Sequence, residues 1–327
     1  SMGVLIQYFF KINIGVSLIV ATLFSVFYLW NGGFSAVVKT DFFQFLCMFI
    51  SFFILFGFLW EKIGSPIQMI GALPDNFTDP LGGNTIQYIL VWFFIAAWTF
   101  IDPGFFQRCA AAKTPETAKK GILIAIIFWA IFDTLTVFCG LYAINILTID
   151  QALLTYPLLA IDILPVGLLG LFLTGIFAII MSTIDSLSFI SAITFGRDIV
   201  WRLKQKPHDN RKIIPYIRIG LIFISIISLT LAYLIPSVVR LLFTLGSIII
   251  PSLILPFIIS LITKDFNVPE KMSIQWILIP LFISFFWLLL SNTQGLIFTE
   301  IEPFYPGMVS SFLYYFIIIR GYQWQLK

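Results

Sequence analysis

Nine long apolar runs constrain this chain more than any other feature of its sequence. They cover residues 14–30, 42–60, 86–106, 122–147, 164–195, 213–235, 241–262, 274–290 and 304–319. A helix of about twenty apolar residues spans a bilayer, and it bonds all of its backbone polar groups internally. Sixty per cent of the residues are hydrophobic and 11% are charged. The pattern predicts an all-α integral membrane protein with about nine transmembrane helices.

Basic residues between the runs predict the orientation. Residues 108–120 and 197–212 hold most of them, and both segments fall on the same side of the predicted bundle. Because positively charged loops stay in the cytoplasm, we expect these connections and the C-terminus there. The many Ile, Phe, Lys and Asn residues suggest an AT-rich bacterial genome, so we expect a multi-pass protein of the bacterial inner membrane. Residues 1–6 look like the end of a further helix, which predicts an N-terminally truncated fragment.

The fifth run carries a polar cluster within its apolar sequence: Ser182, Thr183, Asp185 and Ser186. At 100° per residue, Ser182, Asp185 and Ser186 share one helix face and Thr183 lies beside them. An ionisable group at this depth costs several kcal/mol unless it is paired. Hydroxyl and carboxylate oxygens are ligands that a hard cation such as Na⁺ accepts. The alternative is that the hydroxyls bond carbonyls of their own helix.

Polar residues also begin the second run, after Gly32-Gly33. Asp41 and Gln44 lie on one face there. Asp41 is a second candidate ion ligand, or alternatively, with Thr40, a helix N-cap at the positive end of the helix dipole.

The third run contains Asp102-Pro103-Gly104, which predicts a broken helix because proline removes a backbone donor. Broken helices in transporters commonly form the substrate site. The alternative is a simple proline kink, with Asp102 paired to a neighbouring helix.

Three motifs occur in an order and spacing that point to one family. The first is Gly32-Gly33-Phe34-Ser35-Ala36-Val37 with Thr40-Asp41 and Gln44. The second is Phe106-Gln107-Arg108 with Ala110-Ala111-Ala112-Lys113 and Lys120-Gly121. The third is Gly175 with Ala178, Met181-Ser182-Thr183, Asp185-Ser186 and Arg197-Asp198. From residue 3 to about residue 262, the chain resembles the sodium:solute symporter family of sugar, proline, pantothenate, iodide and sialic acid carriers.

The resemblance implies a LeuT-type bundle of two inverted five-helix repeats, of which the first is incomplete. Residues 1–60 would end the first repeat, 61–85 form an outward loop, 86–262 form the second repeat, and 263–327 add two helices. Ser182, Thr183 and the carbonyl of Ile179 match the common sodium site. Asp41, Asp185 and Ser186, with Ser182, match a second sodium site of some members, in which Asp185 replaces a frequent serine. Trp98, Thr99 and Asp102 match positions that line the substrate cavity.

These features predict a sodium-coupled symporter that imports a small organic solute by alternating access. Its expected partners are the solute, the coupling ion Na⁺ and membrane lipid. Proton-coupled transport through Asp185 or Asp102, and a substrate sensor of the same fold, are the alternatives. The chain has one His and no Cys/His cluster, phosphate-loop motif or nucleic-acid motif. We therefore predict neither an enzyme nor a nucleic-acid-binding protein.

Overall fold

The structure is a computed structural model that describes residues 1–77, 79–148, 152–204, 213–235, 237–263, 268–291, 298 and 300–325. Within these ranges nearly every residue is helical and no strand occurs, so the predicted all-α fold is confirmed. Seven described helices are long and apolar enough to cross a membrane. They correspond to seven of the nine predicted spans. The other two predicted spans, which start at Ile14 and Phe304, are helical but fall short of this criterion.

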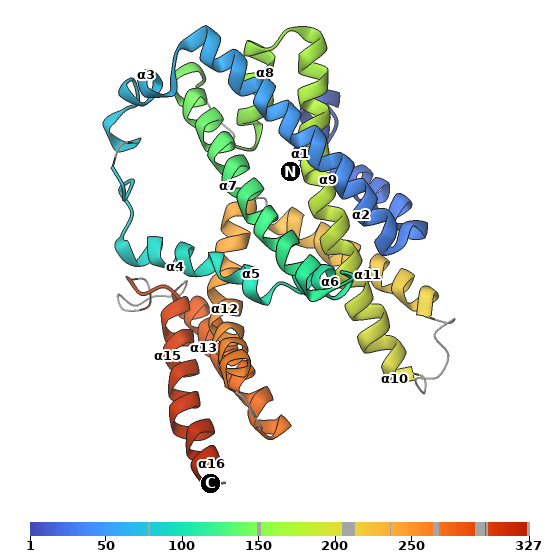
Figure 1. Ribbon diagram of the computed structural model, residues 1–327, viewed down its shortest axis with the longest axis vertical. Helices are drawn as coiled ribbons and strands as arrows, with labels where there is room; N and C mark the ends of the chain where they lie inside the picture. Colours follow the sequence, from blue (N-terminus) through green and yellow to red (C-terminus); the bar gives the residue numbers. More distant parts are fainter. Residues whose placement is uncertain are drawn as a thin grey trace. The chain divides into compact units, whose positions relative to one another are not determined.

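The chain forms two compact units, each described by itself (Figure 1). Unit 1 contains Ser1–Thr78 and Gln107–Pro236, and unit 2 contains Asp79–Phe106 and Ser237–Lys327. The main helices of unit 1 are α1 (Met2–Phe10), α2 (Ile14–Ile63), α3 (Pro66–Gly71), α7 (Pro115–Ile146), α8 (Thr155–Ile163), α9 (Val166–Ile193) and α11 (Ile213–Leu234). A π-helix, η3 (Thr194–Trp201), and the short α10 (Arg202–Lys204) extend α9. The assignment of residues to inverted repeats stays a prediction.

Gly33 divides α2 into two arms. Its φ of 62° and ψ of −179° are not helical, and only glycine adopts such a backbone without strain. Leu29 and Val37, on either side of the break, share one buried cluster. The far ends of both arms lie at α8. Before the first arm, Ile12 lines a cavity together with Leu158 of α8. At the end of the second arm, the Lys62 ammonium donates to the Ile163 carbonyl (2.8 Å). The chain therefore reverses at Gly33, as the predicted connection between two spans requires.

Close contact between α2 and α9 organises unit 1. A Cβ atom on Gly175 of α9 would lie 2.1 Å from the Ser51 hydroxyl oxygen and 3.0 Å from the Cys47 carbonyl oxygen of α2. The Ser51 hydroxyl donates to the carbonyls of Cys47 (2.6 Å) and Leu171 (3.2 Å). Glycine at position 175 thus lets the two backbones approach, as small residues do between membrane helices.

Unit 2 is built on α12 (Val238–Ile262). Against it pack α4 (Ile86–Ala96), α5 (Trp98–Ile101), α13 (Glu270–Ser291) and α15 (Phe304–Tyr314), the last followed by η5 (Tyr315–Ile319) and α16 (Arg320–Gln325). Val91, Ile95, Ile250, Ile254 and Phe304 form its buried cluster. The unit supplies a scaffold for the interrupted helix that follows residue 96.

Two segments predicted as connections contain helices. The predicted outward loop includes α3, which Ser65 and Gln68 close with a reciprocal capping box. The segment around Pro157, between the fourth and fifth predicted spans, is α8. Pro157 lies in the first turn of α8, where backbone N–H groups have no intrahelical acceptor and proline therefore costs nothing.

Candidate functional site

A polar cluster in unit 1 centres on Asp41, within the second arm of α2, where this arm lies along α9 (Figure 1). The Ser182 hydroxyl donates to Asp41 Oδ1 (2.7 Å) and the Ser186 hydroxyl donates to Asp41 Oδ2 (3.3 Å). Both serines lie one turn apart on α9, so their hydroxyls reach the same carboxylate. The structure thus brings together three of the residues predicted to bind an ion.

Arg108 completes this cluster, and sequence reasoning did not assign it to the site. It lies on α6 (Pro103–Ala110), and its Nη2 donates to Asp41 Oδ2 (2.9 Å) and to the Ser186 hydroxyl (2.8 Å). The side chains of Arg108 and Asp41 are 38% and 20% exposed. In this arrangement a guanidinium compensates the carboxylate charge. A metal cation that bound Asp41 Oδ2 would compete with Arg108 for this oxygen.

Asp41 is not the helix N-cap that its sequence context allowed. It lies eight positions past Gly33, inside the helical arm. The neighbouring Thr40 hydroxyl donates backwards to the carbonyls of Ala36 (3.1 Å) and Val37 (2.9 Å). The Asp41 carboxylate is therefore directed to α9 and α6 rather than to backbone N–H groups of its own helix.

Thr183 and Ile179 form a separate pair on α9. The exposed Thr183 hydroxyl donates to the Ile179 carbonyl (3.1 Å). This bond is of the kind expected if the hydroxyls of the fifth run bond carbonyls of their own helix instead of an ion. Thr183 also borders a cavity of about 280 Å³, with Thr22, Ser25, Ser188 and Ser225 contributing further hydroxyls. Ser182 binds Asp41 while Thr183 borders this cavity, so the predicted common sodium ligands point to two different parts of unit 1.

Asp185 differs from its neighbours because it is fully buried, with 0% of its surface exposed. Neither carboxylate oxygen has a hydrogen-bond partner among the residues that the structure describes. One turn along α2 from Asp41, the buried Gln44 also has an unpartnered Oε1 within the described residues. Burying a carboxyl group without a partner is unfavourable in free energy, so a bound cation would stabilise Asp185 more than its neighbours.

Unit 2 holds the three predicted substrate ligands at a real helix break. Asp102 has an extended backbone between α5 and α6 (φ −71°, ψ 119°), which confirms the break predicted from Pro103. Its Oδ1 accepts from the Gly104 backbone N–H (2.6 Å), and its Oδ2 accepts from the Trp98 indole (3.3 Å). Asp102 thus bonds within its own interrupted helix, and Thr99 is exposed beside it.

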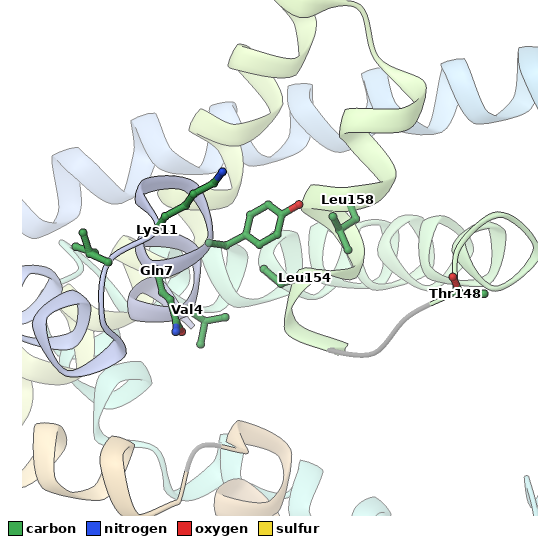
Figure 2. A pocket seen from close by; sticks show the side chains of 8 residues that line it. Val4, Gln7, Lys11, Thr148, Leu154 and Leu158 are labelled. Atoms are coloured by element: carbon green, nitrogen blue, oxygen red, sulfur yellow. The ribbon is translucent and has the colours of Figure 1, made fainter.

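A cavity of about 650 Å³ between α1 and the segment formed by η2 (Ala152–Leu154) and α8 contains none of the predicted ligands. Its polar side chains are those of Gln7, Tyr8, Lys11 and Thr148, and its apolar ones are those of Val4, Ile12, Leu154 and Leu158 (Figure 2). The described residues also contain no group of three or more His, Cys, Asp or Glu side chains arranged for a metal ion. The candidate ion ligands among the described residues of unit 1 are therefore the Asp41 cluster, Thr183 and Asp185.

Comparison with known proteins adds an independent line of observation. A family model described as "Sodium:solute symporter family" matches residues 1–277. A sodium/pantothenate symporter from Haemophilus influenzae is 29% identical over 217 residues, which cover 63% of this chain and 43% of that protein. The high-affinity choline transporter 1 of Drosophila melanogaster is 23% identical (73% and 41% covered), and the sodium/glucose cotransporter 1 of Ovis aries is 22% identical (65% and 39% covered). The chain spans about two fifths of the length of these relatives.

Proposed function

Because this chain belongs to the sodium:solute symporter family, we propose that it is part of a carrier that imports a small organic solute with sodium. Its relatives are transporters rather than enzymes. The observation that supports coupling within this chain is the Asp41 carboxylate, which joins α2, α6 and α9 through Ser182, Ser186 and Arg108. A charge that holds three helices together can link ion binding to their rearrangement.

In this proposal, sodium and the Arg108 guanidinium are alternative counter-ions of the same oxygens. In the structure Arg108 bonds Asp41 and Ser186, and this proposal takes that arrangement as the sodium-free state. When sodium binds, Asp41, Ser182, Ser186 and Asp185 supply oxygen ligands and Arg108 leaves. A second sodium uses the Thr183 hydroxyl and the Ile179 carbonyl. Coupling follows because an ion shifts a conformational equilibrium only when it binds one state better.

The solute binds, in this proposal, at the helix break formed by Trp98, Thr99 and Asp102. Release of Asp102 from Gly104 and Trp98 would make a carboxylate and an indole available to it. The names of the relatives cover an anion (pantothenate), a cation (choline) and a neutral sugar. Uptake of these three compounds, compared under one sodium gradient, tests which charge class the carrier accepts.

Sodium titration of the purified protein tests the ion site. N-methyl-D-glucamine should replace sodium at constant ionic strength, since choline is named as the cargo of a relative. We expect Ser182→Ala and Thr183→Val each to weaken the apparent sodium affinity about fivefold, because each removes one hydroxyl ligand worth about 1 kcal/mol. Tryptophan fluorescence and sodium-driven uptake are the readouts.

Thr134→Val is the matched control for these variants. The exposed Thr134 hydroxyl bonds the Ala130 carbonyl (2.7 Å) much as Thr183 bonds Ile179, but it lies on α7 away from the cluster. It should leave the sodium affinity unchanged. Uptake that stays equally sodium-dependent in both site variants, or that follows only a pH gradient, would rule out this site.

Removing the competing guanidinium should have the opposite effect. In Arg108→Gln we expect sodium to bind about fivefold more tightly, because Asp41 loses a partly exposed ion pair worth up to about 1 kcal/mol. Arg108→Lys, which keeps the charge, should stay close to the unmodified protein. Weaker sodium binding in Arg108→Gln, measured by the same titration, would mean that Arg108 supports the site instead of competing for it.

A further inference from the structure

A third cavity of unit 1 lies where α2 reverses. Its volume is about 250 Å³, and its walls come from the end of the first arm of α2 with Gly33, from α9 and from α11. Its main lining side chains are Leu29, Trp30, Phe189, Ile217, Arg218 and Leu221. All but Arg218 are apolar or aromatic, so the cavity suits a hydrocarbon group with one charged end.

Arg218 supplies that charge at a defined position. Its Nε donates to the Trp30 carbonyl (3.4 Å), and its guanidinium carbon lies 5.0 Å from the centre of the Trp30 ring. The carbonyl belongs to the end of the first arm of α2, where the Gly33 break interrupts the helical bonding. These contacts hold the guanidinium plane at the edge of the cavity. A planar guanidinium can bind phosphate oxygens in pairs while its flat face rests on an aromatic ring.

Basic residues outnumber acidic ones in the described segments next to the cavity. Residues 197–204 and 213–218 contain four Lys or Arg residues and one Asp residue. That residue, Asp198, forms an ion pair with Arg197 (2.8 Å). Trp30 and Tyr216, both partly exposed, lie on the elements around this end of unit 1, and tryptophan and tyrosine are enriched where membrane meets water. The surroundings are therefore those of a lipid headgroup region.

We propose that this cavity is a binding site for an anionic phospholipid. The phosphate of the headgroup pairs with Arg218, and the first part of an acyl chain lies between Leu29, Phe189 and Leu221. The excess of basic residues favours an anionic lipid over a zwitterionic one, as in basic pockets between membrane helices. The basic loops place this lipid in the leaflet that the charge pattern predicts to be cytoplasmic. The site needs neither sodium nor solute, so its test is independent of the transport proposal.

Native mass spectrometry of the purified protein, titrated with phosphatidylglycerol or phosphatidylcholine, tests this site. We expect the unmodified protein to retain phosphatidylglycerol preferentially. Arg218→Gln should weaken phosphatidylglycerol binding about fivefold, the equivalent of about 1 kcal/mol for one basic residue. It should leave phosphatidylcholine binding unchanged. Arg240→Gln, an exposed arginine in the first turn of α12, is the matched control and should change neither value.

Two more variants distinguish the effects of the Arg218 charge and of the cavity volume on lipid binding from a general loss of folding. Arg218→Lys keeps the charge but loses the flat guanidinium, so it should keep most of the preference for phosphatidylglycerol. Ile217→Trp fills the cavity and should weaken lipid binding even with Arg218 intact. Equal losses in Arg218→Lys and Arg218→Gln would show that Arg218 only braces Trp30, and would overturn the proposal. Efficient displacement of the lipid by soluble glycerol 1-phosphate would also overturn it, because the ligand would then be the headgroup phosphate alone.

Discussion

Gly175→Ala is expected to destabilise the protein by about 1–3 kcal/mol, the usual range for overpacking in a tight interior. The added Cβ would lie 2.1 Å from the Ser51 hydroxyl oxygen and 2.5 Å from the Ser51 Cβ. Ser51 is fully buried, and its short side chain has no room to move away. Separation of α2 from α9 should also carry Asp41 away from Ser182, so sodium binding should weaken together with stability. Thermal unfolding in detergent, with and without sodium, measures both effects.

Gly170→Ala provides a control on the same helix. No atom lies within 4 Å of the position that its Cβ would take, so the change should be neutral or stabilise the helix by up to about 1 kcal/mol. Ser51→Gly should partly restore Gly175→Ala, since only the Cys47 carbonyl oxygen at 3.0 Å would then remain close. The coupling energy of this double-mutant cycle should lie between about 0.5 and 3 kcal/mol. Strictly additive effects would show that Gly175 acts elsewhere.

Asp185→Leu should change stability in opposite directions with and without sodium. Without sodium, we expect the variant to be about 1–3 kcal/mol more stable, because it removes a buried carboxyl group that has no described partner. With sodium at a hundred times its dissociation constant, the unmodified protein gains about 2.7 kcal/mol from binding. Asp185→Leu should lose most of that gain. Unfolding curves recorded in sodium and in potassium give both quantities.

Asp185→Asn distinguishes the charge from the shape of this side chain. It keeps the volume and a polar group, so it should lose the sodium effect without the gain in stability that leucine brings. A large loss of stability in Asp185→Leu without sodium would contradict this account, since it would mean that the carboxyl group is already well bonded in the sodium-free protein.

The membrane class, the helices and the pairing of Asp41 with Ser182 and Ser186 could all be predicted from the sequence. The length of each apolar run predicts a helix, and the glycine pair at 32–33 marks the point where the chain reverses. Both signals are local in the sequence, so they can be recognised without the structure. The encounter of Asp41 with Ser182 could be predicted only through the family resemblance, since 141 positions separate the two residues. The helix around Pro157 could not be predicted from the proline itself, because proline interrupts the interior of a helix but is tolerated in its first turn.

Arg108 was missed for a physical reason. In the sequence it is one of several basic residues near a predicted cytoplasmic loop, and positive charge there needs no partner. Only the turn of α6 after Pro103 brings it to the Asp41 carboxylate. The partners of Asp102 were likewise hidden, because a carboxylate at a helix break can bond its own backbone or a different helix. Which of these partners a carboxylate bonds depends on the exact orientation of a single helical turn, and the spacing of apolar residues does not determine that orientation.

The separation between Asp41 and its partners has a consequence for the order of synthesis. Arg108 follows Asp41 by 67 positions and Ser182 follows by 141. At roughly 5–20 residues per second, the ribosome makes Arg108 about 3–13 s and Ser182 about 7–28 s after Asp41. Through that interval, the Asp41 carboxylate lacks these partners. Its bonds to α6 and α9 therefore form only after each of these helices has been made, and Ser182 completes the cluster later than Arg108.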